Sequence, residues 1–170
     1  MRFFKPFLIT LIGLSVVLLA ISSLLPGRVM TSRWVVVHGR SDSIMAAILD
    51  ASTWPEWNLL MKDAHMPVSG ALTKGQKINW ANAGGSINSF IVEEVNPHGL
   101  ATKMELAGEK PFRTGFSVDQ RQVDSVQVVW YLIEELKWYP WEKVYGMMAS
   151  DMKGPLLQTS LNEFKRIQEH

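Results

Sequence analysis

The pattern of hydrophobic and polar positions divides the chain into an apolar N-terminal stretch and a longer part of mixed polarity. Residues 7–25 contain no charged side chain. As an α-helix rising about 1.5 Å per residue they would extend roughly 28 Å, close to the ~30 Å hydrocarbon core of a bilayer. Pro26 and Gly27 follow and are expected to end the helix. The pattern therefore predicts one transmembrane helix within residues 1–27 and a single domain formed by residues 28–170.

A cleaved signal peptide is the alternative explanation of the apolar stretch. Small residues within Ala20-Ile21-Ser22 have the spacing of a cleavage site, which would leave a mature chain beginning at Ser23. The apolar stretch is longer than a typical signal-peptide core of about 7–15 residues. It also continues through Leu24 and Leu25, beyond the cleavage site. These two features favour an uncleaved anchor.

The charges that flank the apolar stretch bear on its orientation in a membrane. Arg2 and Lys5 precede it and favour a cytoplasmic N-terminus, with the domain on the opposite side. Arg28, Arg33 and Arg40 follow it and favour the reverse orientation. Because a short N-terminal tail before a globular domain most often stays in the cytoplasm, we expect a single-pass protein whose domain lies outside.

The domain begins with β-branched and apolar residues at 33–38, which predict a first strand. Ser41 can cap a helix that has Ile44 and Ile48 on one face, and a short second helix fits residues 53–59. Five further segments, bounded by Gly, Asn and Pro, are expected to be strands: 76–82, 86–95, 100–107, 112–119 and 125–136. Their connections are too short for parallel crossovers, so the sheet is expected to be antiparallel.

The C-terminal part changes to a helical period and predicts a long helix. Apolar side chains recur at helical spacing in two runs, the first comprising Trp141, Val144 or Tyr145, Met148 and Met152, and the second Leu157, Leu161 and Phe164. We expect the first run to face the sheet and the second to pack in the core. Pro155 has no N–H to donate, so the pattern predicts a kink or a new start at this position.

Three stretches of the chain resemble one protein superfamily. They are Ile48-Leu49-Asp50 followed by Trp54-Pro55-Glu56-Trp57, the VQVVW segment at 126–130, and the C-terminal residues 139–165. Their order and spacing resemble the START and Bet v 1-like superfamily, also called SRPBCC. Within it, the chain is similar to the polyketide cyclase/dehydrase and lipid-transport group, which includes members with an N-terminal membrane segment. The resemblance implies an α+β helix-grip fold, in which a curved antiparallel sheet surrounds a long C-terminal helix.

The resemblance also implies a cavity between the sheet and the C-terminal helix that binds a small hydrophobic ligand, such as a lipid, an isoprenoid or a polyketide-like molecule. Aromatic and Met side chains, which offer large and adaptable apolar surface, occupy positions where the cavity lining is expected. These candidates are Trp57, Trp80, Trp130, Tyr145, Met148 and Met152. Ordinary core packing is the alternative role for each of them.

The composition argues against several other kinds of chemistry. The chain has no Cys, which excludes disulfide frameworks, thiol nucleophiles and Cys-ligated metal sites. A formal net charge of +1 offers no strongly basic field for nucleic acid. The four His have no metal-ligand spacing, so we expect no metal and no cofactor. Ser150 and Lys153 match a Ser-x-x-Lys motif, but the other motifs of acyl transfer are missing, and both are expected to be solvated.

Two other functions compete with ligand binding. A cyclase or dehydratase enzyme would need a buried His or carboxylate, for which His65, Glu93 and Glu94 are the candidates. Because neighbouring strand residues point to opposite faces, neither Glu93-Glu94 nor Glu134-Glu135 is expected to act as a carboxylate dyad. The resemblance carries no catalytic residue over to this chain, so the sequence favours binding over catalysis. The third hypothesis is a non-catalytic domain that binds a partner through its surface.

Overall fold

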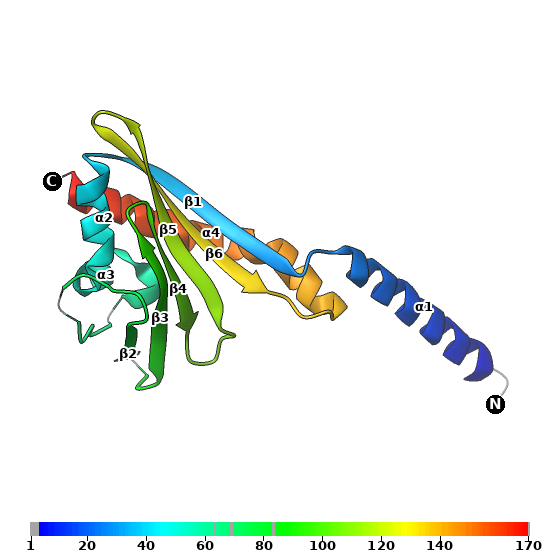
Figure 1. Cartoon of the computed structure of the whole chain (residues 1–170). Coiled ribbons are helices and arrows are strands. Elements are labelled where there is room, and N and C mark those ends of the chain that lie inside the picture. The colour runs from blue at the N-terminus through cyan, green and yellow to red at the C-terminus, as the bar shows by residue number, and fades with distance from the viewer. Residues whose placement is uncertain (1–3, 63, 69, 83, 170) are drawn as a thin grey trace.

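The structure is a computed structural model, which describes residues 4–62, 64–68, 70–82 and 84–169. Its first element is the apolar helix α1 (Phe4–Leu24). It extends away from the rest of the chain (Figure 1), and the side chains along it are largely exposed. Within the described residues, it is the one helix long and apolar enough to cross a membrane, a test that an N-terminal signal sequence also passes. The apolar helix predicted for this end of the chain is therefore present.

The domain that follows is built on one six-stranded antiparallel sheet, which confirms the predicted sheet type. The strands are β1 (Arg28–His38), β2 (Lys77–Ala81), β3 (Ile87–Asn96), β4 (Gly99–Glu105), β5 (Phe112–Gln122) and β6 (Ser125–Glu135), and their order is β1-β6-β5-β4-β3-β2. Short turns join β2 to β3, β3 to β4 and β5 to β6: at the β3–β4 turn, for example, the Asn96 side chain accepts a hydrogen bond from the His98 amide at 2.9 Å. All six predicted strands are present, although β1 begins at Arg28 and not at Arg33.

Helices cover one face of the sheet. The short helices α2 (Ser41–Leu49) and α3 (Trp54–Trp57) precede β2, with single 3-10 turns at Ala51–Thr53 and Leu59–Met61, and the long helix α4 (Pro140–Gln168) ends the chain. Figure 1 shows α4 behind the curved sheet, and it packs mainly against β1. The new start predicted at Pro155 is wrong, because α4 is continuous there. Pro155 lies on the exposed face of α4, where water can hydrate the carbonyl that loses its partner.

An aromatic cluster fills the core between the sheet and the helices. Neighbouring ring centroids in this cluster are 5.0–6.2 Å apart, and its members are Trp54, Trp57, Phe90, Phe116, Trp130 and Phe164. Aromatic rings prefer such edge-to-face and offset arrangements, which contribute beyond the burial of their area. The second run of the C-terminal helix packs against the sheet as predicted, since Leu157, Leu161 and Phe164 are buried.

The first run of α4 faces the opposite way from the prediction. Met148 is 55% exposed and Met152 is 59% exposed, so these side chains do not form part of the buried core. The face of α4 that meets β1 carries small residues instead. A Cβ added at Gly146 would overlap the Leu136 side chain, and one at Gly154 would overlap the Arg33 guanidinium. The glycines therefore let α4 approach the sheet closely, which turns the large apolar side chains outward.

Candidate functional site

Three polar side chains lie between the inner face of the sheet and α4, in the half of the domain nearer α1; we call them the interior polar cluster. Glu134 comes from β6, Thr31 from β1 and Lys153 from α4. The Lys153 Nζ donates a hydrogen bond to the Glu134 Oε1 at 2.8 Å, and the side chains are 22% and 15% exposed. Lys153 is therefore largely buried, and the expectation that it is solvated is wrong.

The charges around Lys153 keep its amine protonated. Burial on its own would lower the pKa of Lys153, but the hydrogen bond and the negative charge of Glu134, with smaller contributions from Tyr145 and Glu109, raise it above the ordinary value. The amine also lies 5.3 Å from the ring centroid of Phe112, at the start of β5, within the range of a cation–π contact. The cluster thus presents a fixed positive charge beside a carboxylate and an aromatic face.

Two polar atoms of this cluster are buried without a hydrogen-bond partner among the described residues: Glu134 Oε2 and Thr31 Oγ1. Both side chains point to the inner face, because Thr31 is paired with Leu132 in the β1–β6 register and Glu134 lies two residues further along β6. A carboxylate oxygen can accept a hydrogen bond, and a hydroxyl can donate or accept one. The cluster therefore has unused hydrogen-bonding capacity in the interior of the domain.

The six candidates from the sequence lie in two different environments. Trp57, Trp80 and Trp130 are buried. Trp57 and Trp130 are in contact, with ring centroids 6.2 Å apart, and Trp80 packs against Phe90 at 5.8 Å. Tyr145, Met148 and Met152 lie instead on the exposed side of α4. The structure thus brings the three tryptophans together in the aromatic core and keeps the other three candidates apart from them.

The polar atoms of the two central tryptophans differ in their partners. The Trp130 Nε1 donates to the Thr114 Oγ1 at 2.7 Å, and that hydroxyl donates in turn to the Tyr131 carbonyl oxygen at 2.8 Å. The Trp57 Nε1 is buried and has no acceptor in the described part of the chain. Trp57 therefore offers a free donor within the aromatic core, whereas Trp130 is already satisfied.

The acidic pair Glu134-Glu135 behaves as strand geometry predicts. Glu134 points inward, and Glu135 pairs with Arg28 on the outer face at 3.7 Å. The expectation that Glu93 and Glu94 point to opposite faces is wrong, because β3 has a bulge between Val92 and Glu94. Glu93 pairs with Arg113 on the outer face, 32% exposed, and Glu94 lines an outer-face pocket with Tyr131.

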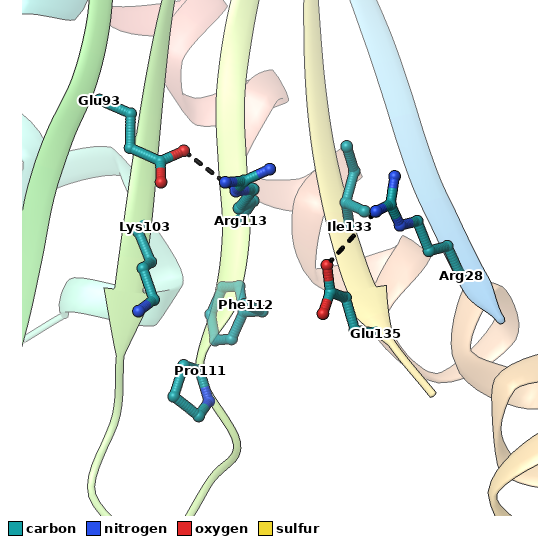
Figure 2. Close-up of a pocket in the computed structure, with 8 residues that line it drawn as sticks. All are labelled: Arg28, Glu93, Lys103, Pro111, Phe112, Arg113, Ile133 and Glu135. Atoms are coloured by element: carbon teal, nitrogen blue, oxygen red, sulfur yellow. Dashed lines mark ion pairs between the residues drawn. The ribbon is translucent and has the colours of Figure 1, made fainter. Parts of the chain in front are cut away.

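The outer face of the sheet carries a depression of about 500 Å³ that is lined mostly by charged side chains (Figure 2). Arg113 pairs with Glu93 at 3.1 Å, Arg28 pairs with Glu135, and Lys103 of β4 pairs with Glu105 at 3.6 Å. Opposite charges compensate one another here, and exposed ion pairs contribute little free energy. This depression therefore lacks the apolar lining that a hydrophobic ligand requires.

The histidine candidate for catalysis also lies at the surface. His65 is exposed on the loop that precedes β2.

Burial raises the pKa of Tyr131, and the charges of Glu94 and Glu93 raise it further, so its hydroxyl stays protonated at neutral pH. In the ranges that the structure describes, no group of three or more His, Asp or Glu side chains is arranged to hold a metal ion. Glu134 is thus the carboxylate whose environment best fits an interior chemical role.

Solved structures with the same arrangement of sheet and helices share little sequence with this chain. A START superfamily protein from Mycobacterium smegmatis superposes with a TM-score of 0.62 at 18% identity, covering 83% of this chain and 97% of its own. The Bacillus cereus protein XoxI superposes with a TM-score of 0.62 at 13% identity, and the match covers 84% of this chain and 99% of XoxI. Truncated norcoclaurine synthase from Thalictrum flavum superposes with a TM-score of 0.58 at 16% identity, and the match covers 84% of this chain and 95% of the synthase.

No protein-family model matches the chain, and no curated protein matches it by sequence. At these identities the structural neighbours establish the fold alone. The six-stranded antiparallel sheet with its long C-terminal helix is the helix-grip fold, as the resemblance implied.

Proposed function

We propose that the domain binds a small hydrophobic ligand, of the lipid, isoprenoid or polyketide-like class, between the inner face of the sheet and α4. The observation that carries this proposal is the interior polar cluster, in which Thr31 Oγ1 and Glu134 Oε2 are buried without partners in the described chain. A buried polar atom that lacks a hydrogen bond costs about 1–3 kcal/mol. A ligand with a hydroxyl or protonated polar group can pair with these atoms and recover that cost. The START-like neighbours support the proposal at the level of fold.

We assign the apolar part of the ligand to the region of the aromatic core beyond the polar cluster, where the side chains are closely packed and must move apart to admit it. Trp57 and Trp130 are the sequence candidates best placed to contact it, and Trp80 lies further along, against Phe90. Burial of an acyl chain contributes about 0.8 kcal/mol per CH₂, or about 10 kcal/mol for a chain of roughly twelve carbons. This is comparable with the ~4–15 kcal/mol lost on association, so hydrogen bonds to the interior polar cluster are needed to add to the affinity.

Entry of the ligand requires the connection between β4 and β5, residues 106–111, to separate from α4. Two ion pairs hold it there: Lys110 with Glu142, and Glu109 with Lys153 at 3.8 Å. Lys110 and Glu109, on the connection, are about half exposed, whereas their partners Glu142 and Lys153, on α4, are 16% and 22% exposed. Opening therefore requires these two ion pairs to separate, and Tyr145, Met148 and Met152 lie on the helix beside this route.

We further propose that α1 is an uncleaved anchor in a membrane, with its N-terminus in the cytoplasm and the domain outside. Support comes from the contact between α1 and the domain, because the Ser22 Oγ donates to the Trp138 carbonyl oxygen at 2.5 Å. Cleavage before Ser23 would remove this hydrogen bond. Intact-mass measurement of the protein from native membranes tests the anchor, and a chain beginning at Ser23 would disprove it.

Mass spectrometry of molecules that co-purify with the full-length protein tests the binding proposal. We expect an apolar molecule bound in stoichiometric amount, and less of it in Thr31→Val, which removes the free hydroxyl of the cluster at nearly constant shape. Thr102→Val is the matched control, because Thr102 is a buried inner-face threonine whose hydroxyl donates to the Thr114 carbonyl oxygen at 3.2 Å. Absence of any bound apolar molecule, together with no shift in melting temperature across a lipid panel, would refute the proposal.

An enzyme is the second candidate function, and the environment of Glu134 favours it. This carboxylate is largely buried and hydrogen-bonded to the Lys153 amine, an arrangement that can hold or transfer a proton. One structural neighbour, norcoclaurine synthase, is an enzyme by its name. The fate of the bound molecule distinguishes the two functions. A binding protein releases the molecule chemically unchanged, whereas a change in its mass that depends on Glu134 would establish catalysis.

A further inference from the structure

The exposed side of the first half of α4 is almost entirely apolar. We call this surface the α4 outer face, and it consists of Trp141, Val144, Tyr145, Met147, Met148 and Met152. Trp141 is 67% exposed and Met147 is 59% exposed, and Asp151 is the one charged residue among them. A helix face that borders water normally carries charged and polar residues. A continuous apolar face of this length therefore indicates that something other than water covers it.

The second half of the same helix shows the normal pattern. Its exposed positions are Pro155, Thr159, Asn162 and Arg166, none of which has a large apolar side chain. Both halves belong to one continuous helix on the same sheet. The difference between them therefore follows the distance from α1, because the apolar half is the one that begins beside the end of α1 (Figure 1).

Direct hydrogen bonds fix the end of α1 to the start of α4. The Lys143 Nζ donates to the carbonyl oxygens of Leu25, at 3.3 Å, and Pro26, at 2.9 Å. The Ser22 hydroxyl bonds the Trp138 carbonyl oxygen in the same region. A bilayer that holds α1 must therefore lie next to Trp138 and the first turn of α4.

Aromatic residues at this junction are of the type that favours a membrane surface. The rings of Trp138 and Tyr139 are 4.8 Å apart, and those of Tyr139 and Trp141 are stacked at 4.9 Å. Trp138 and Trp141 are both mostly exposed, and Lys137 lies beside them. Trp and Tyr concentrate at the level of the lipid headgroups, where one part of the ring is apolar and another is hydrated.

We propose that the α4 outer face is a second membrane-contact surface, which rests in the interfacial layer of the same bilayer that holds α1. Figure 1 shows α1 and α4 leading away from their junction on opposite sides, so this contact requires α1 to turn relative to α4 at residues 25–27. The inference rests on the proposed anchoring by α1 and names the ligand source for the proposed binding function. Tyr145 and Met152 lie on the flank of α4 next to Lys153, and Glu142 on the same flank pairs with Lys110 of the β4–β5 connection. Contact of this face with lipid places the entry route at the membrane surface, so a membrane lipid can enter without crossing water.

Single-cysteine labelling of the full-length protein tests the inference, since the natural chain has no Cys. The variants are Met148→Cys on the α4 outer face, Thr159→Cys on the exposed side of the second half, and Val16→Cys in α1. Each is labelled with an environment-sensitive fluorophore and reconstituted into phosphatidylcholine–phosphatidylglycerol vesicles with or without brominated phospholipid. We expect labels at 16 and 148 to shift their emission to the blue and lose intensity with brominated lipid, and the label at 159 to do neither. Val144→Cys provides a second site on the same face.

The pattern of quenching distinguishes membrane contact by α4 from membrane anchoring by α1. Quenching at 16 with none at 148 or 144 overturns the membrane contact of α4 and leaves the anchor intact. No quenching at 16 overturns the anchor and the inference together, while ligand binding is judged separately by mass spectrometry. A blue shift at 148 that brominated lipid does not quench, and that disappears as the protein-to-lipid ratio falls, shows that a second copy covers the face, which also overturns the inference.

Discussion

Replacing Thr31 by Val should separate a structural role of this residue from a role in ligand binding. The Thr31 hydroxyl is buried and makes no hydrogen bond to the described residues, so the folded protein bears the cost of having desolvated it. Valine has nearly the same shape and no polar atom. Because an unsatisfied buried hydroxyl costs about 1–3 kcal/mol, the substitution is expected to leave the free energy of unfolding unchanged or to increase it by up to about that amount.

Thr114→Val is the matched comparison, since Thr114 is an inner-face threonine with a fully used hydroxyl. It accepts a hydrogen bond from the Trp130 Nε1 at 2.7 Å and donates one to the Tyr131 carbonyl oxygen at 2.8 Å. Its removal leaves the buried indole N–H without an acceptor, which is expected to cost about 1–3 kcal/mol. The two variants, with the same chemical change, should therefore shift stability in opposite directions.

Guanidinium-chloride unfolding of the full-length protein in detergent, followed by tryptophan fluorescence, measures both variants. Ligand retention is measured on the same preparations. We expect Thr31→Val to be at least as stable as the wild type and to retain less ligand. A loss of 1 kcal/mol or more in Thr31→Val, similar to the loss in Thr114→Val, would show that the Thr31 hydroxyl is already satisfied in the free protein. The reasoning that assigns it to a ligand would then fail.

Three further predictions follow from the packing and charges of α4. Gly146→Ala is expected to lower the melting temperature despite the better helix propensity of alanine, because the new Cβ overlaps the side chains of Leu136 and Val29; an unchanged or higher melting temperature would contradict this packing. Met148→Trp is expected to leave the melting temperature nearly unchanged, because Met148 is half exposed; a large decrease would mean that the position is packed. The pKa of Lys153 is raised above the ordinary value of 10.5 in the folded state. Its pairing with Glu134 therefore stabilises the fold fully at pH values below 10.5, and this stabilisation is lost as the pH rises through the folded-state pKa. Unfolding free energies measured across alkaline pH should fall more steeply for the wild type than for Lys153→Met/Glu134→Gln, and parallel curves would refute the assignment.

Most of the sheet could be predicted from the sequence because its signals are local. Alternation of apolar and polar side chains defines each strand, and turns such as that at Asn96 separate them within a few residues. The start of β1 was missed because Thr31 and Ser32 interrupt its apolar pattern. The same Thr31 is part of the interior polar cluster, so the position that weakened the strand signal is the one with an unusual environment.

The remaining differences arise from contacts between distant parts of the chain. The orientation of α4 depends on Gly146 and Gly154, whose lack of a side chain lets β1 approach, and hydrophobic periodicity does not register small residues as a packing face. The bulge at Glu93 shifts the register by one residue, which an alternation rule cannot anticipate. The pairing of Glu134 with Lys153 joins a strand to a helix, and neither residue indicates its partner in the sequence.

The connection between α1 and β1 limits how far the domain can move. It consists only of residues 25–27, between Leu24 and Arg28. Three extended residues span at most about 10 Å. When α1 is embedded in a bilayer, the domain is confined to within a few lipid-headgroup widths of that surface. If the domain binds a ligand as proposed, it can release that ligand to a carrier that comes to the membrane, but it cannot itself transport the ligand across the aqueous space to a second membrane.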